Sequence, residues 1–310
     1  MTPASFEDLV RPYRRELAAH CYRMLGSLAD AEDQVQETLL RAWRGIDGFA
    51  GRSSVKSWLY RIATNTCLDL LRARPRRELP MSSFAPHDPD SALPTASTET
   101  LWMEPAPASL VGPDASLASR ESVQLAFVTA LQQLPATQRA AVVLADVLEW
   151  SAAEIAALLE TTPAAINSAL QRGRTTLEQG SRARQPVDRA VLERYVQAWE
   201  RGDLAALAAL LHDDVIVSMP PIPAWLRGRD AVLAFLGPRM MAGTQRMVRV
   251  DGADDVAFAY YRRDDHGVLT ARAIEVTLWS GDRIRELHAF FDRALVERWG
   301  VQVTLPAIDR

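Results

Sequence analysis

Cysteine, histidine and lysine are scarce in this chain, and long apolar runs are missing. The two cysteines, Cys21 and Cys67, have neither the spacing of a metal site nor that of a redox pair, so we expect buried free thiols. The five histidines are scattered and give no metal site to argue from. No apolar run approaches the ~20 residues that cross a bilayer, and the acidic N-terminal segment lacks the apolar core of an export signal. These absences predict a cytoplasmic protein without a metal, a cofactor or a membrane partner.

The composition is that of a globular protein. Hydrophobic residues make up 48% and charged residues 24% of the chain. The length of 310 residues predicts two or three domains. The net charge of −4 argues against a protein that coats nucleic acid non-specifically. Lys56 is the only lysine, so nearly all basic residues are arginines. Arginine suits phosphates and guanine edges, but such a bias also follows from genome base composition, and we give it little weight.

The pattern of apolar residues and prolines divides the chain into segments of different predicted structure. Residues 5–77 and 120–184 have the closely spaced apolar pattern of helices, whereas 187–310 continues as two helices followed by alternating strands. Between the helical blocks, residues 78–119 have linker composition, and Pro75 to Pro113 holds eight of the 18 prolines. We therefore predict two all-α domains, a Pro-rich linker and a C-terminal α+β domain.

The segment "DAEDQVQETLLRAW" (Asp30 to Trp43) has the pattern of an amphipathic helix. One predicted face is apolar and holds Ala31, Val35, Leu39, Ala42 and Ile46. The opposite face is polar and holds Asp33, Gln36, Glu37, Arg41 and Arg44. Taken alone, the pattern favours an ordinary helix whose polar face meets water.

A second signal lies in "WSAAEIAALLETTPAAINSALQRGRTTL" (Trp150 to Leu177). Ser151 and Glu154 form a predicted capping box, "ETT" makes a turn, and Thr162-Pro163 opens another helix. This order is typical of a helix-turn-helix. On the second helix we expect four residues to pack inward: Ala165, Ile166, Ala169 and Leu170. Five should face outward: Asn167, Ser168, Gln171, Arg172 and Arg174. The alternative is an αα-hairpin with a solvated face, but the stretch contains no acid after Glu160, which favours DNA.

A third signal is "FAGRSSVKSWLYRIATNTCLDLLRAR" (Phe49 to Arg74), a Gly/Ser loop that enters a helix. Its predicted inner face holds Val55, Leu59, Ile62 and Thr66, and its polar stripe holds Arg61, Asn65, Asp69 and Arg72. Aromatic residues (Phe49, Trp58, Tyr60) alternate with basic ones (Arg52, Lys56, Arg61). Stacking surfaces beside cations suit unpaired bases, although packing in the core is the commoner use of such aromatics.

These three segments, in this order, resemble an extracytoplasmic-function sigma factor of bacterial RNA polymerase over about Ser5 to Leu177. The resemblance implies binding to core RNA polymerase and promoter DNA. The implied contacts to the β′ clamp helices are Asp33, Gln36, Glu37, Arg41 and Trp43, with the β flap as a further polymerase contact. The implied −10 contacts are Arg52, Lys56, Arg61 and Asn65. The implied −35 contacts are Asn167, Ser168, Gln171, Arg172 and Arg174. The resemblance identifies no anti-sigma partner.

The last 120 residues resemble the NTF2-like cone fold, particularly its SnoaL-like branch. We expect two helices, the second ending near His212, then a curved antiparallel sheet with a hairpin turn at Ser280-Gly281-Asp282. "LWMEPAP" (Leu101 to Pro107) resembles a Trp-x-Glu-Pro element of sigma factors that carry this extension. The resemblance implies a sigma factor whose C-terminal domain modulates promoter-specific initiation.

Two other interpretations of the extension stay open. Relatives of the cone fold include enzymes, and His288, Glu286, Phe290 and Asp292 would alternate on one strand. A candidate ligand pocket would be lined by Met219, Trp225, Trp279 and His288. The whole chain could also be a ligand-responsive helix-turn-helix regulator, which would need no polymerase-binding stripe. We favour a non-catalytic control module.

Overall fold

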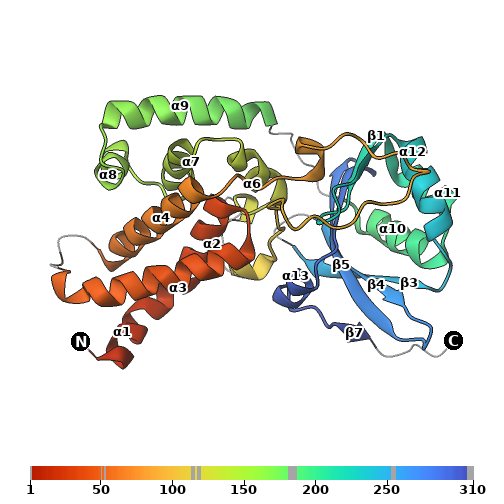
Figure 1. Ribbon diagram of the computed structural model, residues 1–310, viewed down its shortest axis with the longest axis horizontal. Helices are drawn as coiled ribbons and strands as arrows, with labels where there is room; N and C mark the ends of the chain where they lie inside the picture. The colour runs from red at the N-terminus through yellow and green to blue at the C-terminus, as the bar shows by residue number, and fades with distance from the viewer. Residues whose placement is uncertain are drawn as a thin grey trace. The chain divides into compact units, whose positions relative to one another are not determined.

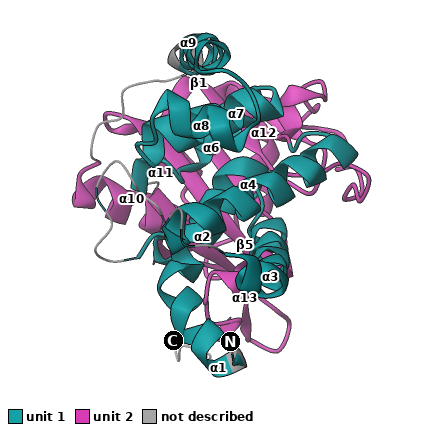
Figure 2. Cartoon of the chain, turned by 90° about the vertical axis from the view of Figure 1, so that its left-hand side faces the viewer, with its two compact units in different colours: residues 1–77, 103–181 teal, residues 78–102, 182–310 magenta. Residues whose placement is uncertain are grey.

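The structure, a computed structural model, describes residues 2–49, 51, 54–112, 116, 120–180, 187–252 and 256–305. The chain divides into two compact units (Figure 1, Figure 2). Met1–Arg77 and Met103–Ser181 form the helical unit, and Glu78–Trp102 and Arg182–Arg310 form the C-terminal unit. Both predicted helical domains therefore share one unit, and much of the Pro-rich linker belongs to the other.

The first half of the helical unit is built from four helices joined by short turns. They are α1 (Pro3–Val10), α2 (Arg14–Leu25), α3 (Leu28–Gly45) and α4 (Val55–Ala73), with 3-10 turns at Arg11–Tyr13 and Ile46–Gly48. Gly26 ends α2 in the left-handed conformation at φ 70°, which lets Ser27 cap α3 directly afterwards. Cys21 and Cys67 are buried free thiols between these helices, as the sequence predicted.

The second half contains the predicted helix-turn-helix. Its described elements are α6 (Leu125–Gln132), α7 (Ala136–Val142), a π-helical turn (Val143–Val147), α8 (Ala152–Leu158) and α9 (Pro163–Gly180). Apolar side chains from each helix, such as Val128, Leu144 and Ile155, are completely buried. A further 3-10 turn spans Ala108–Leu110. None of the helices in the described part of the chain has the length and apolar character needed to cross a membrane.

The C-terminal unit is a sheet covered by helices. Its helices are α10 (Arg189–Arg201), α11 (Leu204–Leu210), α12 (Arg229–Leu236) and α13 (Arg293–Arg298), with 3-10 turns at Pro80–Ser82 and Gly237–Arg239. Its strands are β1 (Leu211–Ser218), β2 (Trp225–Arg227), β3 (Gln245–Asp251), β4 (Val256–Arg263), β5 (Leu269–Ser280), β6 (Arg283–Phe290) and β7 (Thr304–Leu305). The order across the sheet is β2-β1-β6-β5-β4-β3, and β7 pairs with β5.

Three details of this unit differ from the sequence predictions. The sheet is mixed, because β1 and β6 run parallel. The helix before it ends at Leu210, and His212 lies in β1, where alternate side chains such as Val215 and Val217 enter the core. Asp292 does not extend the β6 pattern but caps α13 through the backbone N–H groups of Ala294 and Leu295. The predicted hairpin turn between β5 and β6 is present, with Gly281 at φ 59°.

Candidate functional site

The polar stripe of α3 is exposed as the sequence predicted. Ala31, Val35, Leu39 and Ala42 are buried, whereas Asp33, Gln36 and Arg41 are exposed. Ser27 caps the helix and Asp30 is acidic in its first turn, which suits the positive end of the helix dipole. The stripe is thus held on a rigid element whose other side is anchored in the core.

Two stripe residues already have partners within the chain. Glu37 Oε1 accepts a hydrogen bond of 2.6 Å from Arg41 Nε, and Arg41 also reaches Asp69 of α4 at 3.4 Å. These side chains are 38–52% exposed, so solvent screens the pairs and their energy is small. Asp69, a stripe residue of α4 in the prediction, thus meets the α3 stripe. Leu40 lies within the stripe and is 51% exposed, which places an apolar group among the charges.

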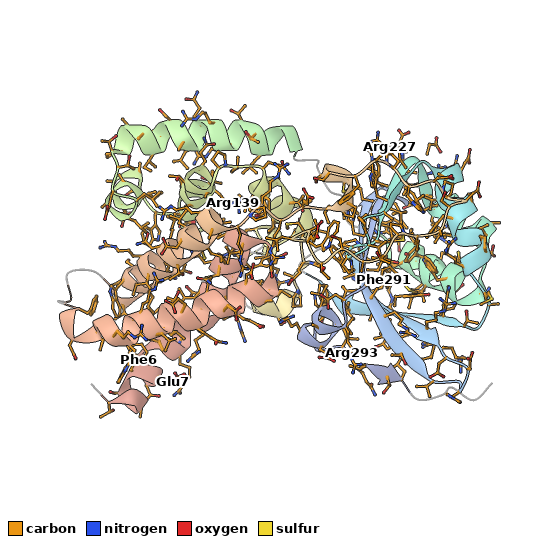
Figure 3. The ribbon with its side chains drawn as sticks, in the orientation of Figure 1. Phe6, Glu7, Arg139, Arg227, Phe291 and Arg293 are labelled. Carbon is orange, nitrogen blue, oxygen red and sulfur yellow. The ribbon has the colours of Figure 1, made fainter. Side chains whose placement is uncertain are left out.

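Trp43 is half-buried at the other end of this surface. Its ring packs edge-to-face against Phe6 of α1, with centroids 5.2 Å apart (Figure 3 labels Phe6). The pair fixes α1 beside the C-terminal half of α3. Trp43 therefore has a packing role in this structure in addition to any contact it makes with a partner.

The start of α3 is held by a residue that the sequence analysis did not single out. Glu104 accepts hydrogen bonds from Ser27 Oγ at 2.9 Å and from the Leu28 backbone N–H at 2.7 Å. Its own carbonyl accepts one from Tyr22 Oη at 2.7 Å. Beside it, Met103 is completely buried and its Sδ would lie 2.8 Å from a Cβ at Gly26. The signal was present in "LWMEPAP", but its spacing alone does not reveal which helix the carboxylate caps.

The exposed face of α4 carries the predicted promoter-melting residues. Arg61 and Asn65 are exposed, while Leu59 and Thr66 are buried and Val55 and Ile62 half-buried. Lys56 is exposed and forms an ion pair with Glu16 at 2.6 Å. Arg52 lies outside the described residues.

The aromatic residues near α4 divide between two uses. Tyr60 is buried, lies 5.9 Å below the Lys56 ammonium, and donates to Glu16 at 3.3 Å. Burial raises the pKa of Tyr60, with the Glu16 charge as the next cause. Trp58 is half-buried and stacks on Phe49 with centroids 4.8 Å apart. The core use of Tyr60 is therefore confirmed, and the Phe49–Trp58 contact connects Phe49 to the first turn of α4.

The helix-turn-helix has the predicted capping. Ser151 and Glu154 form both halves of a capping box, and the Ala165 backbone N–H donates to Thr162 Oγ1 at 3.2 Å. Glu160 turns the chain with φ 53°, in the left-handed region that is uncommon for a residue other than glycine. The turn residues "ETT" therefore set the angle between α8 and α9.

One predicted inward residue of α9 is wrong. Ile166, Ala169 and Leu170 are buried, but Ala165 is exposed. It lies about 100° around the helix from Ile166, outside the buried stripe. The stripe instead continues to Gly173, where a Cβ would lie 2.7 Å from Val142 Cγ2 of α7. We expected Gly173 to weaken the helix end, yet α9 continues to Gly180 and the glycine allows close helix packing.

The outward face of α9 presents all five predicted −35 residues to solvent. They are Asn167, Ser168, Gln171, Arg172 and Arg174. The two arginines differ, because Arg174 Nε bonds Asp146 Oδ2 at 3.1 Å while the described residues give Arg172 no ion pair. The hydrogen bond to Asp146 raises the pKa of Arg174 further above its usual range. Arg174 must therefore give up its pair with Asp146 before its guanidinium contacts a partner.

Two buried guanidinium groups join the halves of the helical unit. Arg139 of α7, labelled in Figure 3, donates to the carbonyl of Met24 at the end of α2 and to Gln132 Oε1 at 2.6 Å. Arg23 Nε donates to Ser122 Oγ at 2.9 Å. Both arginines are 3% exposed, and burial lowers the pKa of each to about 10. The sequence analysis missed these contacts, since a lone arginine does not indicate that it is buried.

The structure does not bring the four candidate pocket residues together. Met219 and Trp279 lie in the core cluster that α10 and α11 cover. Trp225 and His288 both pair with Ser218, and their neighbours Leu226 and Leu287 belong to that cluster. Because side chains alternate along a strand, Trp225 and His288 point to the opposite face of the sheet. His288 bonds Ser218 Oγ at 2.8 Å and Glu286 Oε2 at 3.1 Å, so it is a satisfied buried histidine.

The covered face of the sheet contains one buried acid. Glu275 of β5 is 3% exposed and accepts a hydrogen bond from Tyr195 Oη of α10. Desolvation raises the pKa of Glu275 to about 7, and burial beside the Glu275 charge raises the pKa of Tyr195. The ring of Tyr195 also meets Phe258 and Trp279, with centroids 5.2 and 6.0 Å away. In the described residues, no group of histidine, cysteine or acidic side chains has the arrangement of a metal site.

Comparison with known proteins decides the family. Residues 9–77 match Sigma-70 region 2, residues 124–177 match Sigma-70 region 4, and residues 192–297 match the SnoaL-like domain. The ECF RNA polymerase sigma factor SigG of Mycobacterium tuberculosis is 40% identical over 97% of this chain and 85% of its own length. The chain belongs to the extracytoplasmic-function sigma factors.

Other relatives match different shares of the chain. SigW of Bacillus subtilis is 33% identical over 56% of this sigma factor and 87% of its own length. The crystal structure of Mycobacterium tuberculosis SigJ covers 97% of the chain and 100% of its own, with a TM-score of 0.61 and 24% identity, which is a likeness of fold. The protein is a sigma factor for promoter-specific transcription initiation, and this identity argues against catalysis.

Proposed function

We propose that the α3 stripe, with Trp43 beside it, contacts core RNA polymerase and that α4 and α9 contact two separate promoter elements. On this view α4 faces the melted −10 element and α9 reads the −35 element as duplex. The residue assignments are those that the family resemblance implied, and the exposure of most of them on helices supports the proposal, although Glu37 and Trp43 are half-buried and Arg52 lies outside the described residues. Polar stripes on two helices and a basic reading face on a third serve one task, which is to position the polymerase at a start site.

The observation that carries the proposal is the pattern of exposure on α3. An amphipathic helix needs only a solvated polar face, but here Leu40 is 51% exposed among Asp33, Gln36 and Arg41. An apolar group surrounded by charged and amide groups is the composition of a protein interface with a polar rim. The same helix is anchored in the core by Val35 and Leu39.

The helical unit is too small to reach both promoter elements in its compact form. Elements at −10 and −35 lie about 25 base pairs apart, or about 85 Å at ~3.4 Å per pair. A compact unit of roughly 150 residues has a radius of gyration of ~15 Å and a diameter of ~40 Å. The α2–α4 and α6–α9 halves must therefore separate before both elements are bound. We propose that this opening breaks the buried contacts of Arg23 and Arg139 and that binding to polymerase provides the free energy.

The C-terminal unit is proposed to modulate this opening. The Tyr195–Glu275 pair lies in an apolar interior, and strand pairing with alternation of side chains puts the four candidate pocket residues on opposite faces of the sheet, which supports a non-catalytic role. A structural control module is the function that these contacts favour.

The test is a charge reversal on α3. Asp33→Arg with Glu37→Arg should abolish co-purification with core polymerase, because repulsion replaces complementary charge across the interface. Glu193→Arg on α10 is the matched control, since Glu193 is exposed and also pairs with an arginine four residues away, at 2.9 Å. The control should bind polymerase normally. A folded double variant that binds core polymerase at full strength would show that the interface lies elsewhere.

A further inference from the structure

The Pro-rich segment 78–102 is packed as part of the C-terminal unit rather than as a free connection (Figure 2). Trp225 holds it at two points. The Trp225 indole N–H donates to the Phe84 carbonyl at 2.7 Å, and the His87 backbone N–H donates to the Trp225 carbonyl at 2.7 Å. Further along, the Ser97 backbone N–H donates to the Pro221 carbonyl at 2.8 Å.

The location of these contacts explains why an extended segment binds there. Trp225 belongs to β2, the edge strand of the sheet, whose unpaired carbonyls can accept hydrogen bonds from an added chain. Pro221 lies in the loop between β1 and β2. Leu93 packs against the apolar core cluster of the sheet, which adds an apolar anchor between the two polar ones. Four prolines in the segment restrict its backbone and so reduce the entropy lost on binding.

The two ends of the segment close on each other. Glu78 and Trp102 form a parallel bridge, with the Glu78 N–H bonded to the Leu101 carbonyl at 2.9 Å. The Trp102 indole donates to the Ser97 carbonyl at 3.1 Å, and its ring lies 5.9 Å from that of Phe84. The segment is therefore a closed loop, which leaves the helical unit at Arg77 and returns to it at Met103.

The residues that flank the loop are fixed on one helix. Before the loop, Arg77 bonds Asp30 Oδ2 at 2.6 Å. After it, Glu104 caps Ser27 and Leu28. Both flanks therefore meet the first turn of α3, the helix that carries the proposed polymerase stripe.

We infer that the edge of the sheet at β2 and the loop before it form a receptor for residues 78–102. This non-covalent grip, and not only the covalent connection at 181–186, attaches residues 187–310 to the start of α3. The occupant of the receptor is the chain's own linker. The grip itself is independent of the proposed function, but its consequence for polymerase binding rests on it.

The test cuts the covalent connection at residues 181–186 and leaves the non-covalent contacts of residues 78–102 with the sheet intact. A protease site is inserted within residues 181–186 of the full chain, the folded protein is cleaved, and the two pieces are separated by size-exclusion chromatography at low micromolar concentration. We expect 187–310 to co-elute with the rest of the chain. Separation of the wild-type pieces would overturn the inference.

Linker variants test whether the loop is what holds the pieces together. Leu93→Asp removes the apolar anchor, and Ser97→Pro removes the backbone N–H that donates to the Pro221 carbonyl. Neither change alters a strand of the sheet. The matched control is Ala96→Asp with Thr95→Pro, which places the same two side chains at exposed positions of the same segment. The cleaved variant should separate and the cleaved control should not. Equal retention of both would show that other contacts hold the domain, and the inference would be wrong.

Hydrogen exchange gives a readout without chromatography. The amides of His87 and Ser97 should exchange slowly in the uncleaved wild-type chain, although a Pro-rich linker free in solution exchanges at once. Trp225→Ala should speed the exchange of His87 about tenfold or more, in line with a lost anchor. Fast exchange at both amides in the wild-type chain would contradict a bound loop. Neither experiment depends on transcription, so either can fail while the proposed function stands.

Discussion

In the helical unit burial lowers the pKa of basic groups, whereas in the C-terminal unit it raises the pKa of an acid. In the helical unit the buried groups include His20, Arg23 and Arg139, which are all basic. Burial lowers the pKa of His20 to about 3, and the imidazole bonds Thr64 Oγ1 at 3.0 Å. In the C-terminal unit the buried groups include His288 and the acid Glu275, and burial raises the pKa of Glu275 to about 7.

The difference teaches that the two units should respond oppositely to pH. Burial that keeps a group neutral carries no ionisation penalty in the pH range where the same group is also neutral in the unfolded chain. Outside that range the fold loses stability, because the unfolded chain can ionise the group and the folded chain cannot. For His20 that range is above pH 6.5, and for Glu275 it is below pH 4.5. Arg23 and Arg139 remain charged at neutral pH and depend on hydrogen bonds rather than titration.

The largest expected effect follows from removing a buried cation. Arg139→Ala would leave the carbonyls of Met24, Gln132 and Leu134 without their shared donor. We expect a loss of about 3–5 kcal/mol of unfolding free energy in the helical unit, measured by urea titration. The control is Arg76→Ala, which removes one exposed hydrogen bond to Gln133 and should cost about 0.5 kcal/mol or less. Equal costs would show that the buried contact does not hold the two halves together.

The second prediction concerns acid destabilisation of the helical unit. The folded pKa of His20 lies below the unfolded value, so the unfolded chain binds more protons between pH 6.5 and 3. Stability should therefore fall as the pH drops, by roughly 2 kcal/mol between pH 6.5 and 5. Thermal unfolding of full-length protein and of His20→Gln should reveal the difference, because the variant cannot titrate. A wild-type slope that persists unchanged in the variant would assign the effect to other groups.

The third prediction reverses the sign in the C-terminal unit. The folded pKa of Glu275 lies above its unfolded value of 4.5, so the folded chain binds more protons between pH 4.5 and 7. The contribution of Glu275 to stability should be highest below pH 4.5 and should fall by roughly 2 kcal/mol between pH 5 and 7. Glu275→Gln keeps an acceptor for the Tyr195 hydroxyl and should flatten this slope. If both units lose stability in the same direction of pH, the contrast between their interiors does not hold.

Much of this arrangement could be predicted from sequence because it depends on local patterns. The α3 and α4 stripes and the capping of α8 follow from side-chain period and from residues at fixed offsets, such as Ser151 and Glu154. The family, the fold class and the SnoaL-like extension were also predictable and are confirmed. The domain limits and the individual contact residues stay predictions.

What could not be predicted depends on long-range pairing. Glu104 caps a helix 76 residues earlier in the chain, and Arg139 bonds a carbonyl 115 residues away. Trp225 and His288 were expected in one pocket with Trp279, but strand order and alternation separate them. No local pattern contains that information, because a strand reveals its two faces but not which face is covered.

The smallest expected effect is a change in promoter recognition when an arginine on the surface of α9 is replaced. The control is an arginine on the C-terminal unit. Arg172 has no ion pair in the described residues, whereas Arg174 is paired with Asp146. If Arg172 contacts a base edge, Arg172→Ala should lower discrimination between −35 variants by about 1–2 kcal/mol at one position. If Arg174 contacts a phosphate, Arg174→Ala should weaken binding evenly across sequences. Arg229→Ala, which breaks a 2.6 Å pair with Asp213 on the C-terminal unit, is the control and should change neither. Run-off transcription by reconstituted holoenzyme on a −35 library separates these outcomes. Unchanged preference in the Arg172 variant at every position would show that α9 does not read bases through this residue.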